Sequence, residues 1–536
     1  MYRIAIYIKV RVRQYLHDDR NKRFFFVYQA ITTTIRDWSH ALVYKFSQSL
    51  HLPWPAAYMW KAGNLINNLS SLIESDKYDS LSAERLRQEL LMILGYVERI
   101  ATSSPDCLQL RCSLALMTGR TNEFLKLQVQ VFESQEAQTE LAGTLNQDIR
   151  VLEPHHHILV GIGSTIHLDA YVKAGVLGMR PLTRTVILHE SWLRRYAVNP
   201  CMLDYWRPFI DIVEDEDQLR TLRPLKKHLA FNVTGPMRCG STIIPWGHSA
   251  AVFVQREWDR QLRKPLLQLA DGHRERGLAA LQTLGVPRTA WITTLHAREG
   301  KFGAHRHSEP FRDADINTYL AAIEAITDRG GWVIRMGDSS MTPLPKMRNV
   351  IDYANDPIKS DWMDVFLCAS ARFMIGTSSG PSTISRAFGV PIAMTNHLQA
   401  STNYLGAHDL FLPRLLRRRA NGTLASFEQQ MSLPFSACFS DGMYRNLCGL
   451  DVIPNTAVEI RELMEEIMDS LDGTLQYSPE DQKLQHRFNT LTAECGTLLG
   501  LPGIGLQCRI GRDFLMRHQN LLADNFKNHD QPNLER

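Results

Sequence analysis

Residues 286–395 alternate between short apolar runs and amphipathic stretches, and this alternation limits the fold more than any other feature of the chain. Four apolar runs have the length of strands, at 290–295, 332–336, 372–375 and 392–395. Between the first two, Ile316, Leu320 and Ile323 recur at helical spacing. Strands that alternate with helices predict a parallel sheet covered by helices.

Polar residues gather where these predicted strands end, and ligands of such sheets bind beyond the carboxyl ends of the strands. The first run stops at a His-Ala-Arg segment, the second at Gly-Asp, and the third opens into Gly-Thr-Ser-Ser-Gly before a helix. We therefore expect these positions to form a ligand site, with the candidate residues His296, Arg298, Arg335, Asp338, Thr377, Ser378, Ser379 and Gly380.

The loop 376–380 suits an anion. The N–H groups at a helix start lack partners within the helix, and the helix dipole places positive charge there. Arg298, at the end of a different strand, offers a guanidinium that binds phosphate oxygens in bidentate fashion. A diphosphate is the expected guest, although no Gly-Lys-Ser/Thr sequence follows to make a P-loop. The alternatives are a plain capping turn for the loop and a paired core arginine at Arg335.

Residues 286–395 resemble the carboxy-terminal half of a poorly characterised family of bacterial glycosyltransferases. That half is distantly similar to the O-fucosyltransferases and to the nodulation and α1,6-fucosyltransferases. The similar residues are His296-Ala-Arg298, Gly337-Asp338 and the helix–strand–loop unit 364–379.

The resemblance implies that Arg298, Ser378 and Ser379 hold the diphosphate of a nucleotide-sugar donor. It also implies a GT-B arrangement, in which two Rossmann-like domains bind the acceptor and the donor respectively. Fucosyltransferases commonly carry a second arginine after the first, whereas Glu299-Gly300 follow here. A fucose donor is therefore not implied.

The expected fold class is α/β, a GT-B-like pair of Rossmann-like domains with an α-helical N-terminal extension. We expect four regions: helical residues 1–150, an N-terminal Rossmann-like acceptor domain with a connecting helix at 151–284, a C-terminal nucleotide-sugar-binding domain at 285–475, and C-terminal helices at 476–536. The connecting helix is predicted at 249–284, and the arginine-rich run 414–419 is expected on a solvated helix face.

An acceptor-activating base should come from the first Rossmann-like domain. Strands are predicted at 158–160 and 185–188, with a helix from about His167 to Gly175 between them. His167, Asp169 and Glu190 are the candidate catalytic residues because they lie at or just after the ends of these strands, and His189 beside Glu190 is a further choice. Without an Asp-x-Asp-like motif, we expect no metal site, and Arg298 with the helix start would stabilise the leaving diphosphate. No cofactor is expected beyond the nucleotide-diphosphate sugar itself.

Composition narrows the class of protein. With 60 basic and 56 acidic residues the net charge is +4, which gives no nucleic-acid signature. Nine cysteines without a CxxC pair suit a reducing compartment. No apolar stretch is long enough for a transmembrane helix, and the basic residues 1–25 fail as a signal peptide. We expect a cytoplasmic protein, whose basic terminus is either solvated or in peripheral contact with the inner membrane face.

The sequence thus predicts a metal-independent glycosyltransferase of bacterial polysaccharide biosynthesis, acting on a glycan, lipid-linked or protein acceptor. Two alternatives stay open. One is a nucleotide-donor phospho-alditol transferase or a nucleotide-sugar epimerase on the same plan. The other is a non-catalytic protein whose helical region binds a partner and whose sugar-nucleotide site is vestigial.

Overall fold

The computed structural model of the 536-residue chain describes residues 55–75, 79–100, 105–117, 120–142, 149–152, 163, 165–180, 182–190, 199–225, 230–231, 236–245, 247–299, 310–398, 405–432, 435–438, 440–495 and 506–522. Two compact units divide the chain, Met1–Thr118 and Gly119–Arg536. The basic segment 1–25 and the predicted strand at 158–160 lie outside the described residues.

The first unit is helical where it is described. Its helices are α3 (Pro55–Glu74), α4 (Ser80–Ile100) and α5 (Pro105–Met117). α3 packs against α4 and α5, and Leu69 and Leu90 are buried in their core. None of the described helices of the chain combines the length and the apolar character that crossing a bilayer requires.

The second unit begins with α6 (Thr121–Ala142) and a four-stranded parallel sheet of order β3-β2-β1-β4. The strands are β1 (Ile149–Leu152), β2 (Arg184–Leu188), β3 (Asp211–Val213) and β4 (Ala230–Phe231). The helices that accompany this sheet are α7 (Thr165–Val176), α9 (Pro200–Trp206) and α10 (Glu216–Leu222). A hairpin follows, made of β5 (Met237–Cys239) and β6 (Thr242–Ile244). β2 confirms the strand predicted at 185–188.

The single connecting helix predicted at 249–284 is wrong. Two helices occupy this stretch, α12 (Gly247–Arg260) and α13 (Asp271–Thr283). Leu262 has a positive φ of 52°, which ends α12. Pro265 then cannot donate a helical hydrogen bond, so the chain stays irregular until α13 begins.

A seven-stranded parallel sheet follows, of order β15-β12-β11-β10-β7-β8-β9. Its strands are β7 (Ile292–His296), β8 (Trp332–Arg335), β9 (Val350–Ile351), β10 (Met374–Gly376), β11 (Ile392–His397), β12 (Leu410–Pro413) and β15 (Arg509–Ile510). Numbered from β7 along the chain, the spatial order is 3-2-1-4-5-6-7, which begins as the Rossmann order does. The order reverses between β7 and β10, and a ligand of such a sheet binds at this switch point.

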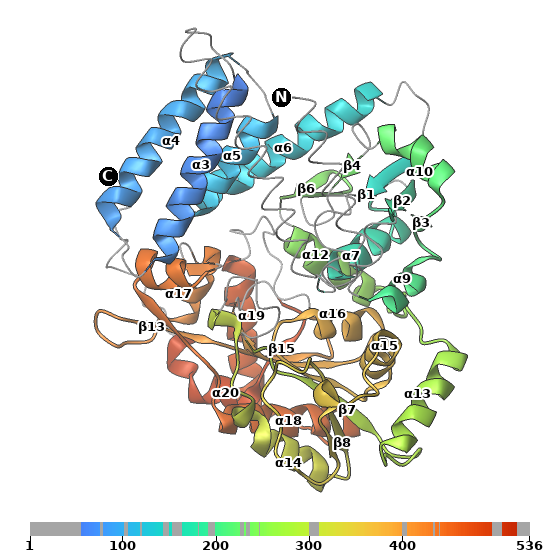
Figure 1. Cartoon of the computed structure of the whole chain (residues 1–536). Coiled ribbons are helices and arrows are strands. Elements are labelled where there is room, and N and C mark those ends of the chain that lie inside the picture. Colours follow the sequence, from blue (N-terminus) through green and yellow to red (C-terminus); the bar gives the residue numbers. More distant parts are fainter. Residues whose placement is uncertain are drawn as a thin grey trace. The chain divides into compact units, whose positions relative to one another are not determined.

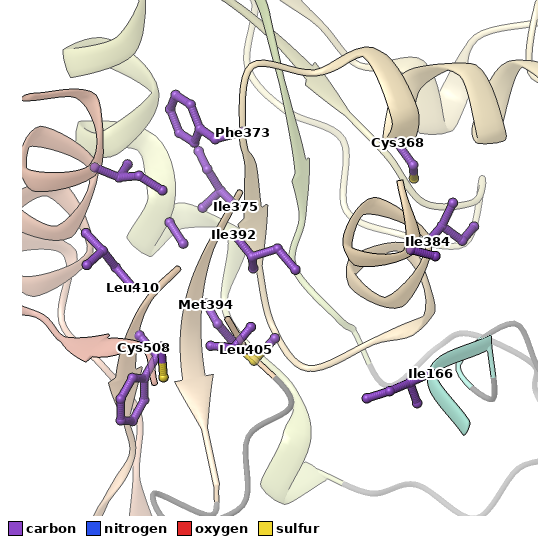
Figure 2. Close-up of a cluster of buried hydrophobic side chains, with 14 of the residues drawn as sticks. Ile166, Cys368, Phe373, Ile375, Ile384, Ile392, Met394, Leu405, Leu410 and Cys508 are labelled. Carbon is purple, nitrogen blue, oxygen red and sulfur yellow. The ribbon is translucent and has the colours of Figure 1, made fainter. Parts of the chain in front are cut away.

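Helices cover both faces of this sheet (Figure 1), with α14 (Leu320–Asp328) and α18 (Ala457–Asp472) on one side and α15 (Asp361–Ser370) and α16 (Gly380–Ala387) on the other. Asp315 caps the short 3-10 helix (Ile316–Tyr319) that leads into α14. Figure 2 shows the core, in which Ile375 of β10 and Met394 of β11 lie among side chains from neighbouring strands and helices. The remaining helices of this part are α17 (Phe427–Met431), α19 (Pro479–Cys495) and α20 (Arg512–Arg517).

The run 414–419 is not on a helix as predicted. It contains strand β13 (Leu415–Arg418), which pairs antiparallel with β14 (Leu450–Ile453). Arg414, at its start, is buried and donates from Nε to the backbone carbonyl of Asn396. Solvent reaches only the later arginines of the run, Arg417 to Arg419.

Candidate functional site

The site lies at the switch point, where β7 and β10 are direct neighbours with Gly376 opposite His296. A Cβ atom at Gly376 would lie 2.3 Å from the His296 carbonyl oxygen, so only glycine allows this close approach. The Thr377 N–H then donates to the same carbonyl at 3.1 Å. These contacts bring the loop 376–380 beside residues 296–299.

His296 is buried between residues 296–299, of which it is the first, and the loop 376–380. Its Nδ1 lies 2.9 Å from Ser379 Oγ. Burial lowers the pKa of the imidazole to about 4, and the nearby Arg335 charge adds to the lowering. His296 is therefore neutral at physiological pH and holds Ser379 at the start of α16.

Arg298 is anchored and still partly exposed. Its backbone N–H donates to Thr377 Oγ1 at 3.1 Å, and its Nη1 donates to Asp313 Oδ1 at 2.5 Å. The side chain of Arg298 keeps 20% of its surface exposed. The Asp313 carbonyl in turn accepts from the buried Arg414. One carboxylate thus orients the guanidinium and leaves part of it accessible.

Arg312 is a second arginine of the site, and our sequence analysis missed it. It ends a 3-10 helix (Pro310–Arg312) in the connection after β7, and its Nη2 donates to the Ser378 carbonyl at 3.1 Å. Its position between β7 and the next helix, at the carboxyl edge of the sheet, is the signal that could have found it.

His248, at the start of α12, lies close enough to Arg312 for an electrostatic interaction between the two side chains. His248 is a further residue that the sequence did not single out. Its ring meets that of His167 edge-on, with 4.6 Å between the centroids.

The start of α16 completes the site. Ser379 is the N-cap, and Ser382 Oγ donates to the Ser379 carbonyl at 2.6 Å. Gly163 lies so close to this turn that a Cβ atom there would be 4.0 Å from Gly380 Cα. The helix start offers N–H groups and a positive dipole end at this place.

Arg335 and Asp338 have local partners. Arg335 is completely buried and donates to Glu299 Oε1 at 2.9 Å, Asp352 Oδ1 at 3.2 Å and the Thr342 carbonyl at 3.2 Å. It is the paired core arginine of the alternative interpretation. Its partner Glu299 directly follows Arg298, so the pair fixes the chain next to the site. Asp338 accepts from the Ser340 N–H at 2.7 Å and so caps its own turn.

The predicted catalytic residues lie on helix α7 and after strand β2. His167 and Asp169 are buried in helix α7, at the position of the helix predicted from about His167 to Gly175. Asp169 accepts from Lys173 Nζ at 2.5 Å, and burial raises the pKa of the carboxyl while it lowers that of the ammonium. This pairing gives Asp169 a structural role.

Glu190 does follow a strand, as expected. It comes directly after β2 and His189, accepts from Arg223 Nε at 3.3 Å, and keeps 26% of its side chain exposed. His189, beside it, is buried with Nδ1 3.0 Å from Glu214 Oε1. Of the predicted catalytic side chains, only that of Glu190 is partly open to solvent.

No group of three or more His, Cys, Asp or Glu side chains placed to hold a metal ion occurs in the described part of the chain. The cationic groups of the site are those of Arg298 and Arg312, together with the start of α16. This arrangement fits a ligand that carries two or more negative charges on oxygen.

No protein-family model matches the sequence, and a comparison with curated proteins finds no match. Among solved structures, the chain is distantly similar to a family 9 glycosyl transferase from Veillonella parvula, with a TM-score of 0.33, 12% identity, and coverage of 49% of this chain and 85% of that one. It is also distantly similar to TibC from enterotoxigenic E. coli, an iron-containing dodecameric glycosyltransferase, with a TM-score of 0.31, 12% identity, and coverage of 61% and 77%. A second TibC structure, in complex with ADP-D-β-D-heptose, gives a TM-score of 0.33, 14% identity and the same coverage. At these scores the likenesses are weak.

Proposed function

We propose that this chain is a glycosyltransferase that takes a sugar from a nucleoside diphosphate donor and transfers it to an acceptor. The observation that carries the proposal is the convergence of Arg298, Arg312 and the start of α16 at the switch point of the seven-stranded sheet. The resemblance of residues 286–395 to bacterial glycosyltransferases supports the same assignment.

In the reaction, the bond between the anomeric carbon of the sugar and the diphosphate oxygen breaks, and an acceptor oxygen takes the place of the diphosphate. The leaving diphosphate gains negative charge, which Arg298, Arg312 and the helix dipole of α16 are placed to stabilise. Ser378 and Ser379 add hydroxyl groups beside the phosphate oxygens. These groups do the work that a bound cation does in other transferases, so we propose a metal-independent transfer.

The acceptor is proposed to bind on the first Rossmann-like domain, in a GT-B arrangement. Glu190 is the proposed acceptor-activating base because its carboxylate is partly exposed at the end of β2. The acceptor is a hydroxyl group of a glycan, a lipid-linked saccharide or a protein.

Ligand-induced thermal stabilisation of the full chain tests the donor site. We expect one of GDP, UDP, CDP, dTDP or ADP to raise the melting temperature of the wild type, since a ligand at a hundredfold excess over its Kd stabilises the folded state by about 2.7 kcal/mol. The shift should disappear in Arg298→Ala and persist in Arg288→Ala, a matched control whose arginine is exposed and outside the site. Repeating the melts with EDTA tests whether nucleotide binding needs a metal ion.

If none of the five nucleotides shifts the wild-type melt, the donor-site assignment is wrong. If a nucleotide shifts wild type and Arg298→Ala equally, binding is real but lies elsewhere. Turnover with the matching nucleotide sugars then separates a transferase from a protein that only binds the nucleotide.

A further inference from the structure

Two cysteine thiols lie side by side in the segment that supports the candidate site. The Sγ atoms of Cys438 and Cys448 are 3.3 Å apart. Cys438 is buried, whereas Cys448 is partly exposed. Nine residues separate them along the chain, including a π-helix (Met443–Leu447).

The segment between the two cysteines contacts the loop that carries Arg312. Asp441 Oδ2 accepts from the Phe311 N–H at 3.3 Å, and the Tyr444 ring lies 5.9 Å from the Phe311 ring. Phe311 directly precedes Arg312, which donates to the Ser378 carbonyl. A displacement of the segment is therefore passed to the guanidinium next to the proposed diphosphate.

We propose that Cys438 and Cys448 form a redox-modification site, at which peroxide converts the dithiol to a disulfide and thereby loosens the Arg312 loop. A metal site is the other use of two close thiols, but the described residues place no third His, Cys, Asp or Glu beside them. The second part of the proposal, the effect on the donor site, rests on the proposed function.

The chemistry balances with hydrogen peroxide as the oxidant. The Cys448 thiolate attacks one peroxide oxygen, an S–O bond forms, the O–O bond breaks, and hydroxide leaves. The Cys438 sulfur then attacks the Cys448 sulfenic acid, so the S–S bond forms and the S–O bond breaks, and the hydroxide and the thiol proton leave as water. Two thiols lose two electrons, and the peroxide gains them.

Cys448 starts the reaction because it is the more exposed of the two cysteines, so that peroxide can reach it. Hydrogen bonding to Cys448 and burial both raise the pKa of Cys438. Cys438 therefore serves as the resolving thiol, held next to the sulfur that it must attack.

Closing the bond moves the sulfur atoms from 3.3 Å to about 2 Å apart. We expect the segment that carries Asp441 and Tyr444 to shift with them. The hydrogen bond from the Phe311 N–H is already long at 3.3 Å, so we expect this contact to be lost first. The expected result is a loss of nucleotide affinity of about fivefold, which equals the energy of one such bond.

Peptide mapping of the oxidised full chain tests the modification. After a small excess of hydrogen peroxide and alkylation of the remaining thiols, trypsin cuts at Arg445 and places the two cysteines on the separate peptides 420–445 and 446–461. We expect these peptides to be linked in the wild type, separated by dithiothreitol, and unlinked in Cys448→Ser. Cys201→Ser, which changes a partly exposed cysteine outside the pair, should behave as wild type.

Nucleotide affinity, measured by calorimetry on the same samples, tests the coupling. We expect oxidation to weaken binding in the wild type and in Cys201→Ser, and to leave it unchanged in Cys448→Ser. If the linked peptides do not appear, the modification site is refuted. If they appear while affinity stays constant, the coupling is refuted. A failure of reduced and oxidised protein alike to bind any nucleotide counts against the proposed function and leaves the disulfide result standing.

Discussion

The ends of β7 and β8 make a direct comparison, because each neighbouring strand brings an arginine to the same edge of the sheet. Arg298, after β7, pairs with Asp313 and keeps 20% of its side chain exposed. Arg335, the last residue of β8, is completely buried and pairs with both Glu299 and Asp352. The two arginines thus differ in role: Arg335 stabilises the fold, and Arg298 remains accessible to a ligand.

Desolvation explains the difference. Removing a guanidinium from water costs several kcal/mol unless carboxylates and hydrogen bonds offset the loss. Arg335 has two carboxylates and a carbonyl for this purpose, and no surface remains for a ligand. Arg298 keeps contact with solvent, so phosphate oxygens can reach it without breaking a buried network. A partly exposed arginine at the end of a strand is therefore the better sign of an anion site.

The largest expected effect comes from replacing Arg335, the buried one of the two arginines. Arg335→Met leaves the Glu299 and Asp352 carboxylates without their cation, so we expect the free energy of unfolding to fall by about 3–5 kcal/mol in chemical denaturation. Arg298→Met, the matched control, should lower it by less than about 1 kcal/mol. Equal losses in the two variants would contradict the comparison.

The next effect is the pH dependence of stability that His296 brings. Its folded pKa of about 4 lies below the unfolded value of 6.5, so its contribution is complete above pH 6.5 and is lost as the pH falls through 4. We expect this loss to be roughly 3 kcal/mol at most. Denaturation of wild type and His296→Gln from pH 8 to pH 4 isolates it, because glutamine retains a partner for Ser379 and does not titrate. Parallel pH profiles of the two proteins would show that His296 is not held neutral.

A smaller effect is expected from removing the exposed arginine, and it should appear in binding. Arg298→Ala loses the charge-assisted bonds to the donor diphosphate, which lowers nucleotide affinity by about 10- to 100-fold, or ~1.5–3 kcal/mol. Titration calorimetry with the nucleotide that stabilises the wild type measures this. Arg298→Lys should recover only part of the loss, because an ammonium lacks the planar fork of donors. Full affinity in the alanine variant would remove Arg298 from the site.

The smallest effect sharpens the role of the carboxylate that holds Arg298. Asp313→Asn removes the negative charge that competes with phosphate for the guanidinium, and the amide oxygen can still accept from Nη1. We expect nucleotide affinity to rise by about two- to fivefold, or ~0.4–1 kcal/mol. A drop in affinity would mean that Asp313 acts chiefly by orienting Arg298.

Much of the seven-stranded sheet could be predicted because its strands are continuous apolar runs between clear turn signals. The strands at β7, β8, β10 and β11 appear where the sequence predicts them. Predictions failed where local signals compete with periodicity. The apolar spacing through 249–284 hid the break near Pro265, and the charge of the run 414–419 hid a strand.

The site shows the same limits. His296, Arg298 and Ser379 could be predicted because they follow strands whose ends meet at the switch point. For Arg312 the sequence offers only its place in the connection after β7, because its contact with Ser378 joins residues 66 positions apart. The helix that carries His167 and Asp169 could be predicted, but the burial of both side chains within it could not.

By itself the sequence determined the alternation of strands and helices, the parallel sheet that follows from it, and the polar edge where a ligand is expected. These features depend on periodicity and on residues within a few positions of one another. Only the tertiary structure decided which charged groups are paired in the interior and which remain accessible. The partners come from distant positions of the chain, as Glu299 does for Arg335 across 36 positions, and burial sets whether a charge serves the fold or a ligand.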